Sequence, residues 1–152
     1  MIRKGRAIVT DPHVSISIAP AGDVVVLDMW GEGAPKLHGV HAMQVEPRRW
    51  WLVDAGDKIE VITEALGDKG AITPIGGDLM RATLTGPGWR SQLMISGVFD
   101  AESPGFKPGD CAATIIGHSS IWIDVISDET AHAYFAASLH TAIEHVWVQR
   151  AD

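Results

Sequence analysis

The sequence is poor in several residue types that define particular classes of protein. Its 152 residues include one cysteine and one tyrosine. The lone cysteine, Cys111, rules out an internal disulfide and a zinc site built on cysteines. Basic residues number 12 against 19 acidic residues, which gives a net charge of −7. Because nucleic-acid binding requires a basic surface, we expect no nucleic-acid partner.

Long apolar runs are also missing. No run approaches the roughly 20 residues that a membrane-spanning helix needs. The basic start of the chain, residues 1–12, lacks the apolar core of a signal peptide. We therefore expect a cytoplasmic protein with no membrane partner. With 152 residues, 46% of them hydrophobic, the chain has the size of a single domain over residues 1–152.

Alternation of apolar and polar residues predicts a chain rich in β-strands. Strands are expected at 14–19, 24–29, twice within 40–53, and at 71–75, 79–85, 111–116, 121–126 and 132–136. The break Pro20-Ala-Gly-Asp23 predicts that the first two strands pair as an antiparallel hairpin. Residues 30–39, rich in glycine and proline, are expected to form a loop.

Helical spacing predicts a smaller number of short helices, at 57–66, at 89–96 and after residue 138. Asp57 and Glu60 resemble a capping box, and Gly67 is a typical helix end. Residues 130–148 also permit one long helix. We prefer a strand followed by a helix with Ser138 as its N-cap. Strand–strand–helix–strand recurs in both halves, which predicts an α+β fold of two intertwined β-α-β type halves with antiparallel sheets.

Gly86-Pro87-Gly88-Trp89 joins a predicted strand to a predicted helix, where a dinucleotide-binding loop would lie. Ser91 occupies the position of the third glycine, and Pro87 lacks a backbone N–H for a phosphate. The segment after the helix is a loop rather than a second parallel strand. These features favour a tight turn with proline near the helix start.

Histidines and possible nucleophiles form no recognisable motif. His38 and His41 lie in or beside a loop, while His140 and His145 are five residues apart and do not share a helix face. We therefore expect no metal site. Cys111 has no basic neighbour in the sequence and is typical of a small buried side chain. The predicted β-hairpin tip Ser119-Ser120 lacks a nucleophile-elbow motif.

Asp78 and Asp124 are the aspartates considered as a general base. Asp78 follows two glycines in a predicted turn. Asp124 falls on the side of its predicted strand opposite the apolar residues. We expect both side chains to be solvent-exposed, and we predict no catalytic residue in this chain.

Tryptophan is unusually frequent, with six residues against one tyrosine. Five lie in predicted elements: Trp50, Trp51, Trp89, Trp122 and Trp147. The adjacent pair Trp50 and Trp51 must face opposite sides of one strand. Two explanations are equally weighted: a second packing layer within the domain, or a protein–protein interface, where tryptophan is enriched.

Several short motifs, in this order and spacing, resemble the gamma subunit of heterotetrameric sarcosine oxidase. Leu84-Thr-Gly-Pro87 and Phe106-Lys-Pro-Gly-Asp-Cys111-Ala-Ala-Thr114 match that family's L-S-G-P and F-x-P-G-x-C-A-x-T segments. Upstream, Pro47-Arg-Arg-Trp50-Trp-Leu-Val53 is similar to its P-x-E-W-L-L segment, although Arg49 replaces the glutamate. Ala137-Ser138 matches the strand-then-helix ending. The resemblance covers about residue 40 to the C-terminus.

This resemblance implies a fold like the folate-binding domain of aminomethyltransferase. It also implies a structural subunit with no cofactor, no metal and no active site of its own. Its partners would be alpha, beta and delta subunits. FAD, FMN, NAD and tetrahydrofolate would bind to the alpha and beta subunits, and zinc to the delta subunit. The complex would oxidatively demethylate sarcosine or a related N-methyl amine. The alternatives are a stand-alone folate-binding module for one-carbon transfer and a chain that forms homo-oligomers when isolated.

Overall fold

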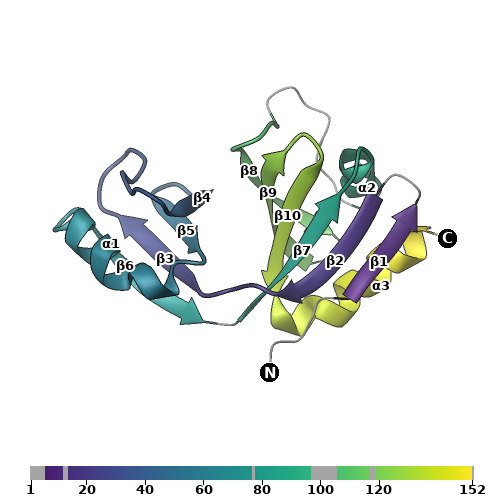
Figure 1. Cartoon of the computed structure of the whole chain (residues 1–152), viewed down its shortest axis with the longest axis horizontal. Helices are drawn as coiled ribbons and strands as arrows, with labels where there is room; N and C mark the ends of the chain where they lie inside the picture. Colours follow the sequence, from purple (N-terminus) through teal and green to yellow (C-terminus); the bar gives the residue numbers. More distant parts are fainter. Residues whose placement is uncertain (1–5, 12–13, 77, 97–105, 117–118, 152) are drawn as a thin grey trace. The chain divides into compact units, whose positions relative to one another are not determined.

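The computed structural model describes residues 6–11, 14–76, 78–96, 106–116 and 119–151. The chain divides into two compact units (Figure 1). Unit 1 comprises residues 1–20 and 79–152, and unit 2 comprises residues 21–78. Unit 2 is thus an insertion in the sequence of unit 1. Both units contain an antiparallel sheet and short helices, so the predicted α+β class is confirmed, while the single-domain assignment stays a prediction.

Unit 1 is built on a six-stranded antiparallel sheet. Across the sheet the strands are β1 (Arg6–Asp11), β2 (Val14–Pro20), β7 (Leu79–Thr85), β10 (Thr130–Ala136), β9 (Ser119–Ser127) and β8 (Cys111–Ile116). Alternation of apolar and polar residues explains why the central segments form strands with one buried face. In β7, Met80, Ala82 and Leu84 are buried, while Arg81 and Thr83 are partly exposed.

Two helices, α2 (Trp89–Ser96) and α3 (His140–Ala151), cover one face of this sheet (Figure 1). A 3-10 turn, Ala137–Leu139, leads from β10 into α3. The helices bury Trp89, Leu93, Ile143 and Trp147 against the apolar face of the sheet. These large side chains account for much of the core of unit 1, because the apolar area they remove from water stabilises the fold.

Unit 2 contains a four-stranded antiparallel sheet in the order β4 (His41–Glu46), β5 (Arg49–Val53), β3 (Val24–Met29) and β6 (Gly70–Gly76). A 3-10 turn, Gly56–Lys58, precedes α1 (Ile59–Leu66). Ile62 and Leu66 of α1 pack with Val25, Leu27 and Leu52 of the sheet. The predicted apolar face of this helix is confirmed.

The predicted hairpin between residues 14–19 and 24–29 is wrong. β2 pairs with β1 and β7, while β3 pairs with β5 and β6. Both sides of β2 are therefore occupied by strands of its own sheet, and the chain passes into unit 2 after Pro20. Strand β1 was not predicted.

Two predicted helix starts are also wrong, although the helices themselves are confirmed. Lys58 precedes α1, and neither it nor the start of the 3-10 turn has a side-chain cap, so Asp57 and Glu60 form no capping box. Ser138 lies inside the 3-10 turn before α3 instead of capping the helix. In both places a 3-10 turn begins the helix and shifts its start. Gly67 does end α1, with φ 57° and its N–H donated to Thr63 O.

No helix among the described residues is long and apolar enough to cross a membrane. The strand-then-helix prediction for residues 130–148 is confirmed by β10 and α3. The loop over residues 30–39 is confirmed as well.

Candidate functional site

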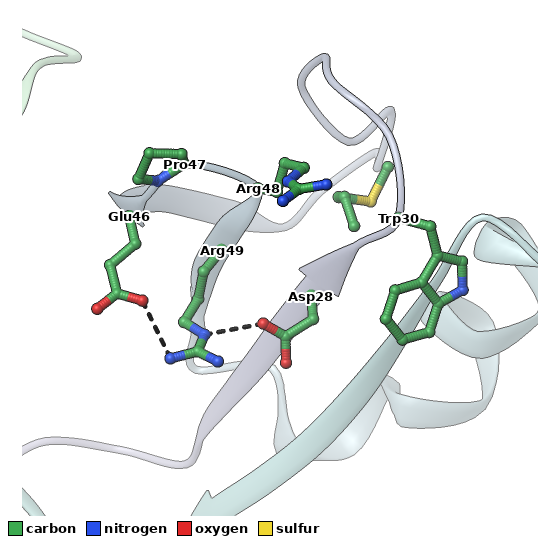
Figure 2. Close-up of a pocket in the computed structure, with 7 residues that line it drawn as sticks. Asp28, Trp30, Glu46, Pro47, Arg48 and Arg49 are labelled. Carbon is green, nitrogen blue, oxygen red and sulfur yellow. Dashed lines mark hydrogen bonds and ion pairs between the residues drawn. The ribbon is translucent and has the colours of Figure 1, made fainter.

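A pocket of about 500 Å³ lies at one end of the sheet of unit 2 (Figure 2). We call it the hairpin pocket, because most of it is formed by the β4–β5 hairpin and the end of β3. It is lined by Asp28, Met29, Trp30, Glu46, Pro47, Arg48 and Arg49. It combines two cations, two carboxylates and an indole in one exposed hollow.

The turn Pro47-Arg48 forms the tip of this hairpin. Pro47 occupies the first central position, which proline favours because its φ is fixed. Arg48 occupies the second with φ 63°, in the left-handed region that normally selects glycine or asparagine. The backbone N–H of Met29 donates to the Arg48 carbonyl at 2.8 Å, which fixes the turn against the end of β3.

Arg49 is matched by carboxylates on both neighbouring strands. Its Nε donates to Asp28 Oδ1 at 2.8 Å, and its Nη1 donates to Glu46 Oε2 at 3.0 Å (Figure 2). The pKa of Arg49 is raised by the hydrogen bond to Asp28, then by the negative charges of Asp28 and Glu46. All three side chains are substantially exposed to water, so this network contributes little to stability. Its role is to hold the guanidinium of Arg49 in place.

Arg48 differs from its neighbour. Its exposed side chain makes no hydrogen bond or ion pair with the part of the chain that the structure describes. Trp30, which also lines the pocket (Figure 2), has 61% of its surface exposed. The hairpin pocket therefore carries one matched cation, one unmatched cation and one uncovered indole.

Two further hollows adjoin the loop that follows Trp30. One of about 470 Å³ shares Pro47 and Arg48 with the hairpin pocket and adds Glu32, Gly33 and Gln44. Another of about 210 Å³ lies under the loop that starts at Trp30, against the end of α1. The Pro47-Arg48 turn thus borders two hollows.

The sequence did not single out Trp30 or Arg48. Trp30 lies in a glycine-rich loop directly after a strand, where no core position is expected. Arg48 follows a proline at a turn position that favours glycine. These two local signals mark side chains held away from the core.

In unit 1, Cys111, Asp124 and His132 lie in one row across β8, β9 and β10. Asp124 is only 1% exposed, so the predicted solvent exposure of this carboxylate is wrong. It lies on a central strand between Cys111 and His132, both half-buried, which remove it from water. Asp78 is exposed, as predicted.

This row is not the arrangement of a cysteine nucleophile. Burial, followed by the charge of Asp124, raises the pKa of Cys111 to about 12. A reactive cysteine needs a lowered pKa, because the thiolate is the nucleophile. The Cys111 thiol is therefore protonated at neutral pH.

The histidines are dispersed. His38 lies in the loop after Trp30, and His41 begins β4. His140 and His145 lie on α3, where His140 Nε2 is 3.3 Å from Glu144 Oε2. No group of three or more histidine, cysteine, aspartate or glutamate residues suited to a metal ion occurs among the described residues. Ser119 and Ser120 begin β9, while Gly117 and His118 lie outside the described residues.

The Gly86-Pro87-Gly88 segment forms a tight turn into α2. The indole Nε1 of the fully buried Trp89 donates to Asp128 O at 2.9 Å. The guanidinium of Arg90 lies over the Trp89 ring, and Arg90 Nη1 donates to Phe106 O at 2.6 Å. Arg90 therefore joins the start of α2 to the loop before β8.

The remaining tryptophans are largely shielded. Trp50 packs toward α1, and Trp51 lies on the opposite face of β5 with 8% exposure. Trp147 is fully buried in unit 1, and Trp122 is half-buried. The five tryptophans singled out by sequence therefore favour the packing explanation, while Trp30 presents an exposed indole.

No protein-family model and no curated protein matches the sequence. Among solved structures, the fold is similar to a chain of the heterotetrameric sarcosine oxidase from Corynebacterium sp. U-96, solved in complex with pyrrole 2-carboxylate. The TM-score is 0.74 at 13% identity, over 90% of this chain and 84% of that chain.

Two other solved structures have TM-scores below 0.5, too low to indicate a shared fold. One is a C-terminal regulatory domain assigned to aspartate kinase in Porphyromonas gingivalis W83. Its TM-score is 0.48 at 12% identity, over 89% of this chain and 96% of that chain. The other is the regulatory subunit of aspartate kinase from Thermus thermophilus. Its TM-score is 0.46 at 14% identity, over 95% of this chain and 99% of that chain. The TM-score of 0.74 to the heterotetrameric sarcosine oxidase chain shows that this chain has the fold of a sarcosine oxidase subunit.

Proposed function

We propose that this chain is a non-catalytic, gamma-type subunit of a sarcosine-oxidase-like flavoenzyme complex. The complex oxidatively demethylates sarcosine or a related N-methyl amine and passes the one-carbon unit to tetrahydrofolate. The observation that carries the proposal is the fold shared with a heterotetrameric sarcosine oxidase chain over most of both lengths.

The motifs behind the sequence resemblance support a structural role. Phe106 is buried and its carbonyl accepts a hydrogen bond from Arg90. Gly109 has φ 95°, and its N–H donates to Val125 O at 2.9 Å. Asp110 accepts a hydrogen bond from the Lys107 N–H at 2.8 Å. The conspicuous residues of this motif thus build a turn against β9.

On this proposal the chemistry belongs to partner subunits. FAD, FMN, NAD and tetrahydrofolate bind to alpha and beta subunits, and a delta subunit completes a cytoplasmic heterotetramer. The protonated thiol of Cys111 accords with a chain that supplies no nucleophile. This chain would contribute surface and shape to the assembly.

Co-expression tests the proposal. The proposal predicts that adjacent genes encode an FAD-binding amine oxidase chain and a four-cysteine zinc protein. The tagged chain is expressed with these neighbours, then purified by the tag and by size exclusion. We expect stoichiometric co-elution and a flavin absorbance spectrum in the complex peak. The proposal is wrong if the flavoprotein is expressed and folded but elutes separately from the tagged chain. In the negative control, the tag is expressed without this chain, and the flavoprotein should elute separately from it.

Tetrahydrofolate titration addresses the stand-alone folate module. With six tryptophans, the isolated chain has a strong intrinsic signal for ligand binding. We expect no saturable quenching up to millimolar tetrahydrofolate. Saturable quenching by the isolated chain would favour the folate-binding module instead.

A further inference from the structure

We infer that the hairpin pocket is a docking site for a protruding segment of the flavoprotein partner, in which a carboxylate side chain lies next to an apolar one. The carboxylate pairs with Arg48, and the apolar side chain covers Trp30. This inference rests on the proposed function, since it names the surface through which the chain joins its complex.

Charge matching within the pocket indicates the first contact. Arg49 is already bound to Asp28 and Glu46, at 2.8 and 3.0 Å, so its charge is satisfied inside the chain. Arg48, one residue earlier, makes no ion pair or hydrogen bond among the described residues. Because Arg49 engages both carboxylates of the pocket, Arg48 is the charged side chain there that has no ion-pair partner among the described residues. A carboxylate is its complement.

The backbone conformation of Arg48 also indicates an external contact. A φ of 63° is unfavourable for an arginine, because Cβ crowds the neighbouring carbonyl. Glycine would occupy the position without strain. The Arg48 side chain makes no hydrogen bond or ion pair within the described chain that offsets this strain. An external partner supplies the missing interaction.

Trp30 indicates the apolar contact. It is 61% exposed, whereas Trp89 and Trp147 are fully buried. Tryptophan, arginine and methionine are enriched at protein interfaces, and tryptophan and arginine most often carry the binding energy. Trp30, Met29 and Arg48 line the same hollow. Its open volume of about 500 Å³ accommodates side chains of a partner segment.

Both anchoring residues are held in place by backbone hydrogen bonds. The N–H of Met29 donates to the Arg48 carbonyl at 2.8 Å, and the N–H of Trp30 donates to the Lys69 carbonyl at 2.9 Å. Pro47 further restricts the turn. A surface ordered before binding loses less conformational entropy on association.

The test measures the affinity of the purified chain for the flavoprotein partner by calorimetry. Arg48→Gly relieves the backbone strain and removes the charge, and Trp30→Ala removes the indole. We expect each substitution to raise Kd at least tenfold while the thermal unfolding temperature of Arg48→Gly stays equal to or above that of the wild type. Kd values within tenfold of wild type for both variants would overturn the inference.

Matched controls lie outside the pocket. Lys107→Ala removes another exposed cation, and Val61→Ala shortens an exposed apolar side chain on α1 that is 68% accessible. Both should bind within twofold of wild type. Equal losses in the controls would overturn the inference, because the effect would not be specific to the pocket.

Charge reversal identifies the chemistry of the partner segment. Arg48→Glu should bind at least threefold more weakly than Arg48→Gly, because it repels a carboxylate. Equal affinities of these two variants would refute the carboxylate contact. If the wild-type chain forms no complex, the proposed function fails. If the wild type binds and the pocket variants bind equally well, only the docking site fails.

Discussion

The guanidinium of Arg90 lies 4.3 Å from the centroid of the Trp89 ring and donates a hydrogen bond to the Phe106 carbonyl. The same guanidinium is 5.8 Å from the centroid of the Phe106 ring. Arg90 thus joins the start of α2 to the loop that precedes β8. A charged side chain packed beside two aromatic rings combines packing, a cation–π contact and a charge-assisted hydrogen bond.

Replacing this arginine should destabilise unit 1. Arg90→Met keeps the aliphatic stem but loses the charge and the hydrogen bond, so we expect the free energy of unfolding to fall by about 1–3 kcal/mol. Urea denaturation followed by tryptophan fluorescence measures this loss. Arg48→Met, at an arginine exposed to solvent, is the matched control and should change stability by less than about 0.5 kcal/mol. Equal losses in the two variants would contradict the role of Arg90.

Arg48→Gly should raise the free energy of unfolding of the isolated chain by about 0.5–1 kcal/mol, because removing Cβ relieves the left-handed backbone at φ 63°. Part of that gain is offset by the greater freedom of glycine in the unfolded chain. Arg48→Ala keeps Cβ and should leave stability unchanged. Urea denaturation of the three proteins gives the comparison. A loss of stability in Arg48→Gly would show that the Arg48 side chain contributes to the fold.

Gly67→Ala should reduce the free energy of unfolding by about 1–3 kcal/mol, because φ 57° with ψ −121° is a conformation that alanine rarely adopts. Gly31→Ala is the control. Gly31 has no positive φ, and a Cβ added there would meet no atom within 4 Å. Thermal unfolding of both variants gives the comparison, and similar melting temperatures would contradict the prediction.

Cys111 should resist alkylation in the folded protein. Its pKa is raised from about 9 to about 12 by burial and then by Asp124. At pH 9 the thiolate is therefore scarce in the folded state and abundant in the unfolded state. We expect iodoacetamide to label the native chain roughly a hundredfold or more slowly than the urea-unfolded chain, because the thiolate is the reacting species. Similar rates would contradict the raised pKa.

The same shift makes stability depend on alkaline pH. Above pH 9 the unfolded chain loses the Cys111 proton while the folded chain retains it up to about pH 12. Ionisation then favours the unfolded state, so the free energy of unfolding falls as the pH rises, by at most about 1.4 kcal/mol per pH unit. Cys111→Ser removes this contribution. Urea denaturation at pH 7 and pH 10 should show a smaller loss in the serine variant than in the wild type.

Local patterns predicted the elements well where they were strong. β7 and α2 have the expected bounds, Leu79–Thr85 and Trp89–Ser96, because alternation stops at the Gly86-Pro87-Gly88 turn. Partners of strands were harder to predict. The pairing of β2 with β7 joins segments separated by all of unit 2, and no local signal encodes such a contact.

The candidate site was less predictable than the fold. Exposure of Trp30 and the lack of an internal partner for Arg48 among the described residues are consequences of tertiary structure, since composition alone places tryptophan inside and arginine outside. Asp124 is the opposite case, a polar side chain that is unexpectedly buried. Its place in the strand alternation correctly put it opposite the apolar residues, yet neighbours on two flanking strands bury it.

The insertion of unit 2 has a consequence for how this chain folds. Pro20 and Met80 are opposite each other in the β2–β7 ladder, so about 60 residues must form a closed loop before the centre of the larger sheet can assemble. If residues 21–78 are still unfolded at that moment, the closure carries the entropy cost of a long flexible loop. Prior folding of unit 2 replaces that loop with a compact body. We therefore expect β2 to pair with β7 faster when unit 2 is already folded, so destabilising the smaller sheet should slow formation of the larger one.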